Sequence, residues 1–240
     1  MQALAPRAQV LRWMTYASLT LFILATLMTF LYPGPEQTMG EVQRIFYIHL
    51  GSFAGAFVLF LAALVGGIAY LRTQNAKWDH LSHASIEIGL VLSAITTVTG
   101  MFWAKPIWGA YWTWDPRLTT IAIMWLTYAA YLFLRAAFDD VQQRRRFAAV
   151  YAILAFGGVI LTTVIIRLRP DVIHPVVMGP SASEDAAVGS FNVSGRIADT
   201  LFFNIFAYLI IAITLVWYRI RLEERSDQVQ ARKAEVLASL

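Results

Sequence analysis

The sequence predicts an all-α integral membrane protein with six transmembrane helices, short loops and a tryptophan-rich outer loop. Of its 240 residues, 58% are apolar and 14% are charged, whereas a soluble domain of this size carries about 25% charged residues. Six stretches are apolar and long enough to cross a hydrocarbon core of ~30 Å, which takes roughly 20 helical residues. The chain contains no separate soluble segment, so residues 1–240 are predicted to form a single polytopic membrane domain.

The predicted spans are residues 12–32, 46–71, 84–103, 118–138, 147–166 and 197–218. The first is too long for a signal-peptide core and lacks a cleavage site, so we expect it to be retained. A P-G-P turn beginning at Pro33 separates it from the second span. Short polar connections, 73–83 and 139–146, follow the second and fourth spans. After the sixth, residues 219–240 alternate acidic and basic side chains in a helical register, which predicts a solvated tail.

Polar residues inside the spans have two interpretations. Most are interpreted as interhelical hydrogen-bonding groups, namely Ser93, Thr96, Thr97 and Thr99 in the third span and Asn204 in the sixth. Glu87 lies four residues after His83, so the two could pair on one face of a helix. An acidic residue within a span indicates function, but Glu87 is close enough to the interface to be simply hydrated. Both interpretations of Glu87 stay open.

The distribution of basic residues predicts the orientation. About two thirds of the 19 lysine and arginine residues fall in segments on the same side as the two termini. Basic residues near span ends favour the cytoplasmic side, so both termini are expected in the cytoplasm of a multi-pass protein of the bacterial inner membrane. The net charge of +4 is then explained by the basic residues of the cytoplasmic segments. We expect membrane lipid, but no nucleic acid, as a partner.

Several absences exclude function classes. The chain has no cysteine, which excludes disulfides, thiolate metal sites and covalent haem attachment through a C-x-x-C-H motif. It has no P-loop motif, so it does not hydrolyse nucleotides by P-loop chemistry. It also lacks H-E-x-x-H and G-x-S-x-G motifs, the starting points for metal-dependent and serine hydrolysis. We therefore predict no catalytic residues and no enzyme activity.

The second outer connection, residues 104–117, is unusually aromatic. It reads AKPIWGAYWTWDPR, with three tryptophans and a tyrosine in a framework of Gly and Pro. A single tryptophan near a membrane surface is ordinarily an interfacial belt residue, but a belt requires neither this density nor this framework. Flat aromatic faces provide stacking area at small entropic cost. The segment therefore predicts a platform for a large, planar, apolar ligand.

Two of the four histidines are expected at the same membrane depth as this platform. His49 lies about one turn inside the outer end of the second span, and His174 lies in the third outer connection between Pro170 and Pro175. A lone loop histidine is more often solvated than a ligand. Two imidazoles beside a planar aromatic platform, however, are explained together by haem, whose iron takes neutral imidazole as an axial ligand. His80 and His83 are expected about 30 Å away, at the cytoplasmic side.

The residues themselves resemble a known family. The run from Trp108 to Thr119, WGAYWTWDPRLT, resembles the tryptophan-rich "WWD" signature of haem-handling proteins used in cytochrome c maturation. Its ending D-x-R-L-T, the short chain and the six spans are most similar to the haem exporter protein C (CcmC) family. RIFYIH, ending at His49, and FDD after the fourth span are also similar. Tyr111 stands where the family commonly has tryptophan, and Pro116 is more typical of the larger CcsA-type members. The third outer connection matches poorly, so the assignment of His174 depends mostly on topology.

This resemblance implies a non-covalent haem b site with His49 and His174 as axial ligands to the iron. The candidate cofactor-binding residues are Trp108, Tyr111, Trp112, Trp114, Asp115 and Arg117. Arg117 favours propionate binding through its planar fork, and Asp115 favours a helix cap. The implied partners are an ABC-type complex (CcmA, CcmB and CcmD), with the ATPase on a separate subunit, and a periplasmic haem chaperone of the CcmE type. The alternatives are a short CcsA-like cytochrome c synthase component and a b-type cytochrome that carries electrons.

Overall fold

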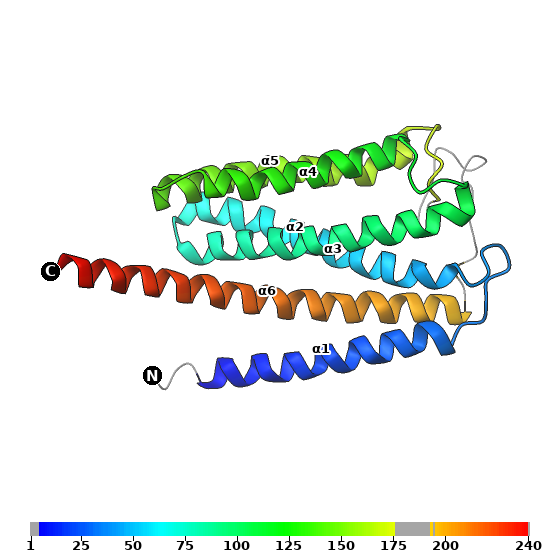
Figure 1. Ribbon diagram of the computed structural model, residues 1–240, viewed down its shortest axis with the longest axis horizontal. Coiled ribbons are helices and arrows are strands. Elements are labelled where there is room, and N and C mark those ends of the chain that lie inside the picture. The colour runs from blue at the N-terminus through cyan, green and yellow to red at the C-terminus, as the bar shows by residue number, and fades with distance from the viewer. Residues whose placement is uncertain (1–4, 176–192, 194, 240) are drawn as a thin grey trace.

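The computed structural model describes residues 5–175, 193 and 195–239. Six helices in this part of the chain are long and apolar enough to cross a membrane, which confirms the predicted class. They are α1 (Ala5–Leu31), α2 (Gln43–Thr73), α3 (Ala76–Trp108), α4 (Pro116–Ala136), α5 (Val141–Leu168) and α6 (Gly195–Ala238). Figure 1 shows α2 and α3 in the middle of the bundle, between the α4–α5 pair and α6, with α1 beyond α6.

Four helices extend well beyond the spans predicted from hydropathy. Helix α1 begins at Ala5 instead of near residue 12, α3 begins at Ala76 instead of near 84, α5 begins at Val141 instead of near 147, and α6 continues to Ala238. The side chains of Asn75 and Asp140 each accept a hydrogen bond from a backbone amide of the first helical turn, so the two helices begin inside the predicted connections. Hydropathy marks the apolar part of a helix, whereas the capping side chains mark where it starts.

Small residues let the central helices approach closely. A Cβ atom on Gly66 of α2 would lie 2.8 Å from the carbonyl oxygen of Trp78 on α3. A Cβ atom on Gly67 would lie 2.9 Å from the carbonyl oxygen of Ala149 on α5. These two glycines therefore place the backbone of α2 against two neighbouring helices, as small residues do in membrane bundles.

Hydrogen bonds between helices include part of the predicted set. Asn204 of α6 donates to the hydroxyl of Thr29 on α1 over 3.1 Å, and the hydroxyl of Thr96 on α3 pairs with that of Ser52 on α2 at 2.9 Å. These two expectations are confirmed. Ser93 and Thr97 instead donate to carbonyl oxygens of their own helix, a local alternative open to short hydroxyl side chains.

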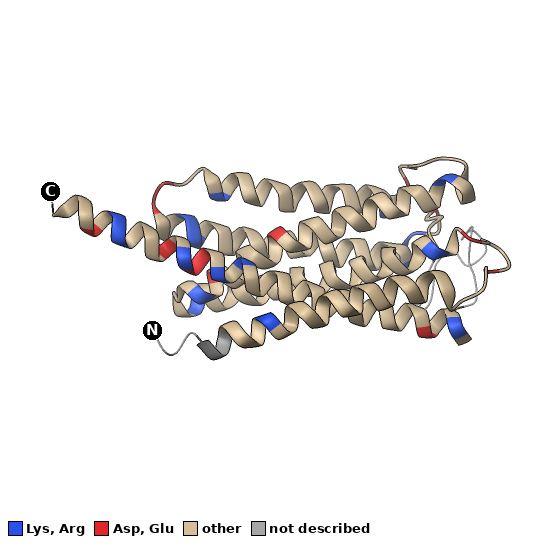
Figure 2. Cartoon of the chain, turned by 60° about the horizontal axis from the view of Figure 1, so that its bottom comes forward, with Lys and Arg blue, Asp and Glu red and all other residues tan. Residues whose placement is uncertain are grey.

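Charged residues gather toward the two ends of the bundle, and the stretch between them is almost entirely uncharged (Figure 2). The start of α1 and the end of α6 lie at one end (Figure 1). The α1–α2 and α3–α4 connections and the start of α6 lie at the other end, and we call it the aromatic end. Of the third outer connection, the structure describes residues 169–175, which include His174, and Val193.

Candidate functional site

A cleft at the aromatic end brings together residues from distant parts of the sequence. Its wall consists of Phe46, His49, Leu50, Thr96, Thr97, Gly100, Met101, Trp103, Ala104, Trp108, Tyr111, Trp112, Leu118, Ile121, His174 and Pro175. Apart from two imidazoles and two threonines, the wall is formed by aliphatic and aromatic side chains, as is typical of pockets for small molecules or cofactors.

His49 is held by the neighbouring helix α3. Its Nδ1 atom lies 2.9 Å from the backbone carbonyl oxygen of Thr96, and the hydroxyl of Thr99 lies 3.4 Å from the same nitrogen. A nitrogen facing a carbonyl oxygen must carry the proton, so the imidazole holds its proton on Nδ1. Nε2 is then left with a lone pair, which is the state of a histidine ready to bind a metal.

His174, in the connection after α5, has a similar hydrogen bond. Its Nδ1 atom lies 2.9 Å from the backbone carbonyl oxygen of Pro175, which again leaves Nε2 as the acceptor nitrogen. Burial lowers the pKa of His174 well below its usual range, and the positive charge of Arg117 lowers it further. The ring of Trp108 meets the His174 ring edge-on at 6.0 Å between centroids.

The two imidazoles are neighbours in the cleft. Their ring centroids are 6.4 Å apart and their planes differ by 30°. The sequence predicted that these histidines share a membrane depth, and the structure brings their rings close together although they come from α2 and from the connection after α5.

The tryptophan-rich segment begins inside a helix, which corrects the expected loop of residues 104–117. Helix α3 continues through Trp108, and Gly109 ends it in a left-handed conformation with φ of 76°. The ammonium group of Lys105 donates to the Gly109 carbonyl over 2.9 Å and lies 5.4 Å from the Tyr111 ring centroid. The left-handed turn at Gly109 therefore ends α3, and Tyr111 and Trp112, which follow it, line the cleft.

The four predicted aromatic residues have different environments. Trp108, Tyr111 and Trp112 line the cleft. Trp114 does not line it, and 75% of this residue is exposed. Its ring packs edge-on against Trp112 with centroids 5.7 Å apart. Three of the four thus form the wall, and the fourth extends from the rim outward.

The segment from Trp112 to Arg117 contains buried polar atoms without a partner among the described residues. They are the indole nitrogen of Trp112, the hydroxyl of Thr113, one carboxylate oxygen of Asp115 and Nε of Arg117. The other oxygen of Asp115 accepts from the amide of Leu118 over 2.9 Å and caps α4, and burial raises the pKa of Asp115. Unpaired buried polar groups are rare in native structures, so their concentration here is typical of a segment that meets a polar part of a ligand.

His80 and His83 lie at the opposite end of α3, and Thr96 is about 24 Å from His80 along the helix axis at 1.5 Å per residue. Their partners are carboxylates of α6, since His80 pairs with Asp227 and His83 with Glu223, each at 3.0 Å. His83 also lies 3.6 Å from Glu87, the pairing considered from the sequence. Neither histidine belongs to the cleft.

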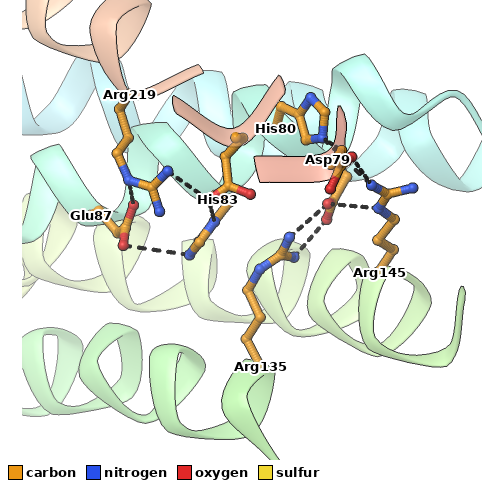
Figure 3. A network of polar contacts seen from close by, with 9 residues as sticks. Asp79, His80, His83, Glu87, Arg135, Arg145 and Arg219 are labelled. Carbon is orange, nitrogen blue, oxygen red and sulfur yellow. Dashed lines mark hydrogen bonds and ion pairs between the residues drawn. The ribbon is translucent and has the colours of Figure 1, made fainter. Parts of the chain in front are cut away.

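Figure 3 shows the network that surrounds these histidines. Asp79 of α3 is buried and accepts two hydrogen bonds from Arg135 of α4, at 2.6 and 2.7 Å. Arg145 of α5 contacts Asp79 at 3.2 Å and Asp227 of α6 at 2.6 Å. Four helices are thereby joined through one carboxylate and its partners. The sequence reasoning missed Asp79 and Arg135, although polar residues three or four apart on α3 and α6 could have indicated facing polar stripes.

Three side chains of this network have the spacing of metal ligands. Ligand atoms of His83, Glu87 and Glu223 all lie within 4.8 Å of one another. Arg219, however, forms ion pairs with both carboxylates. Their negative charge is therefore balanced by a fixed guanidinium, and the group is a polar contact between α3 and α6.

Known proteins are similar to this chain over most of its length. A family model described as "Heme exporter protein C" matches residues 2–235. A protein of that name from Bradyrhizobium diazoefficiens is 26% identical over 234 residues, which are 98% of this chain and 84% of the relative. The Escherichia coli K12 protein of that name is 25% identical over 209 residues, 87% of this chain and 81% of the relative. The match to the Rhodobacter capsulatus protein is 27% over 132 residues, so this chain spans about half (54%) of that relative.

Proposed function

The chain belongs to the haem exporter protein C family. We propose that it is a haem-binding membrane subunit of cytochrome c biogenesis. It would present haem at the outer face of the membrane for transfer to a periplasmic chaperone. The observation that carries the proposal is the pair of neighbouring imidazoles in the aromatic cleft, with ring centroids 6.4 Å apart. Each has its Nδ1 atom fixed by a backbone carbonyl, the arrangement that orients histidine ligands in metal sites.

The residues of the cleft suit a non-covalent haem b. His49 and His174 would be the axial ligands, and Trp108, Tyr111 and Trp112 would cover the macrocycle with flat faces. The unpaired Nε of Arg117 and indole N–H of Trp112 are donors that a propionate carboxylate would satisfy. Asp115 would act mainly through the cap of α4, which fixes Arg117, and Trp114 would extend the platform at the rim.

The partners follow from the same proposal. The chain carries no P-loop motif, so we place the ATPase on a separate subunit of an ABC-type complex with CcmA, CcmB and CcmD-like members. The loaded site would deliver haem to a CcmE-like chaperone, without catalytic turnover on this chain. A b-type cytochrome would need a second imidazole pair near the other leaflet. His80 and His83 do not supply such a pair, because each contacts a carboxylate of α6.

The direct test is an absorption spectrum of the purified protein after addition of haem, before and after reduction with dithionite. Two axial imidazoles predict a six-coordinate, low-spin spectrum in both redox states. Haem that is released on gel filtration, or a purely high-spin spectrum, would rule out the proposed site.

The proposed topology has the aromatic end outside the inner membrane and both termini in the cytoplasm. Because the chain has no cysteine, single-cysteine variants report without background. Gln37→Cys, in the exposed α1–α2 connection, is expected to react with an impermeant maleimide on intact spheroplasts. Asp139→Cys, in the exposed α4–α5 connection, is expected to react only after the membrane is opened. The reverse pattern would invert the topology and place the cleft in the cytoplasm.

Substitutions in the aromatic wall are expected to differ in effect. Trp112→Ala should weaken haem retention markedly, since it removes a stacking face from the cleft wall, worth on the order of 1 kcal/mol or more beyond burial. Trp114→Ala should weaken it less, because 75% of Trp114 is exposed. Both variants should keep a low-spin spectrum in the haem that remains. Haem titrations of the two variants in parallel measure the difference, and an equal or larger loss for Trp114→Ala would contradict this division of roles.

A further inference from the structure

Gly100 of α3 lies directly against the ring of His49. A Cβ atom at position 100 would be 3.0 Å from Cε1 and 3.3 Å from Nδ1 of that imidazole. Both distances are shorter than ordinary contacts between carbon or nitrogen and a methyl group, which begin near 3.5 Å. Any larger residue at this position would therefore displace the ring.

The close approach has a chemical consequence at Thr96. Its carbonyl oxygen is the one that accepts the N–H of Gly100 in the regular i to i−4 pattern of a helix. It also receives Nδ1 of His49 at 2.9 Å and the hydroxyl of Thr99 at 3.0 Å. Helical side chains lean toward the preceding turn, so a side chain at position 100 would cover this carbonyl. Glycine leaves it open to the histidine.

We propose that Gly100 is a positioning residue for the haem ligand His49. By exposing the Thr96 carbonyl, it allows the Nδ1–H hydrogen bond that fixes the tautomer and the orientation of the ring, and so directs Nε2 to the iron. The inference rests on the proposed haem-binding function and extends it to a residue that makes no bond to the metal. Loss of a group that hydrogen-bonds to a metal ligand typically lowers metal affinity by about 10- to 100-fold.

The test is the variant Gly100→Ala, with Gly89→Ala as its matched control. Gly89 lies on the same helix, and a Cβ atom there would approach Phe60 at the same 3.0 Å, so both variants add one methyl group at an equally tight helix contact. Gly100→Ala is expected to raise the apparent Kd for haem about 10- to 100-fold and to introduce a high-spin fraction. The reduction potential should also rise, because an imidazole that loses its Nδ1–H hydrogen bond is a weaker donor to ferric iron. Gly89→Ala is expected to match the wild type in all three measurements.

The outcomes distinguish a failure of the positioning role of Gly100 from a failure of the proposed haem-binding function. If the wild type binds haem in low-spin form and Gly100→Ala behaves like Gly89→Ala, the positioning role is wrong and the proposed function stands. If the wild type shows no six-coordinate haem, the proposed function fails and the inference fails with it. Should Gly100→Ala not fold, the double variant Gly100→Ala/His49→Ala decides. If the double variant folds, the added methyl group clashes with the His49 ring, as proposed. If it still misfolds, the clash lies elsewhere and the positioning role is wrong.

Discussion

Replacing His49 or His174 by alanine is expected to convert the haem spectrum from low-spin, six-coordinate to high-spin, with one axial position left to water or empty. Each replacement removes one of the two neighbouring imidazoles, whose ring centroids are 6.4 Å apart. Haem retention should fall at least tenfold, since a coordinate bond is lost. Spectra and haem titrations of the purified variants measure both effects. Added imidazole should restore the low-spin form, because alanine leaves room for a free ring in the cleft.

His80→Ala and His83→Ala are the controls for this experiment. Both residues lie at the far end of α3 and pair with carboxylates of α6, so their loss should leave the haem spectrum unchanged. The double variant His49→Ala/His174→Ala is the decisive case. An unaltered spectrum in it would remove both residues as ligands, and loss of haem from His83→Ala alone would move the iron to the other end of the bundle.

The largest effect on stability is expected from Asp79→Ala. Asp79 is buried and accepts two hydrogen bonds from Arg135, and Arg145 contacts it as well. Removing one partner of a buried ion pair typically costs about 3–5 kcal/mol, because the remaining charge stays desolvated. Thermal unfolding of the protein in detergent should therefore shift down by roughly 10 °C. Haem, once bound, should keep its low-spin spectrum, since the network lies far from the cleft.

Two further variants identify why Asp79→Ala is less stable than the wild type. The double variant Asp79→Ala/Arg135→Met removes the uncompensated guanidinium, so its unfolding midpoint should lie above that of Asp79→Ala. Glu41→Gln disturbs only the exposed pair with Arg44 and should unfold like the wild type. A double variant less stable than Asp79→Ala would show that Arg135 contributes through packing instead of through its charge.

Local patterns in the amino-acid sequence were enough to indicate the membrane class and five of the residues that line the cleft, His49, Trp108, Tyr111, Trp112 and His174. Apolar length is a local property, so hydropathy located all six helices. The aromatic density of residues 108–114 is also local, and it indicated the cleft wall. Caps are encoded nearby as well, which is why Asp115 was correctly predicted to cap α4. The ends of the helices were predicted less well, because α1, α3, α5 and α6 continue past the bilayer-length segments to which hydropathy is sensitive.

How these residues meet depends on the packing of the helices. The orientation of His49 depends on a carbonyl oxygen of α3 and on the missing side chain of Gly100, and no pattern in the sequence relates position 49 to position 96 or 100. Likewise, Asp79 reaches Arg135 and Arg145 only after α3, α4 and α5 have packed. Helix periodicity specifies which face of a helix a residue occupies, whereas the neighbour on that face is set by the packing of the whole bundle. Trp112 and Trp114 are alike in the sequence, but in the folded chain Trp112 is half-buried and lines the cleft, whereas Trp114 is exposed and does not line it.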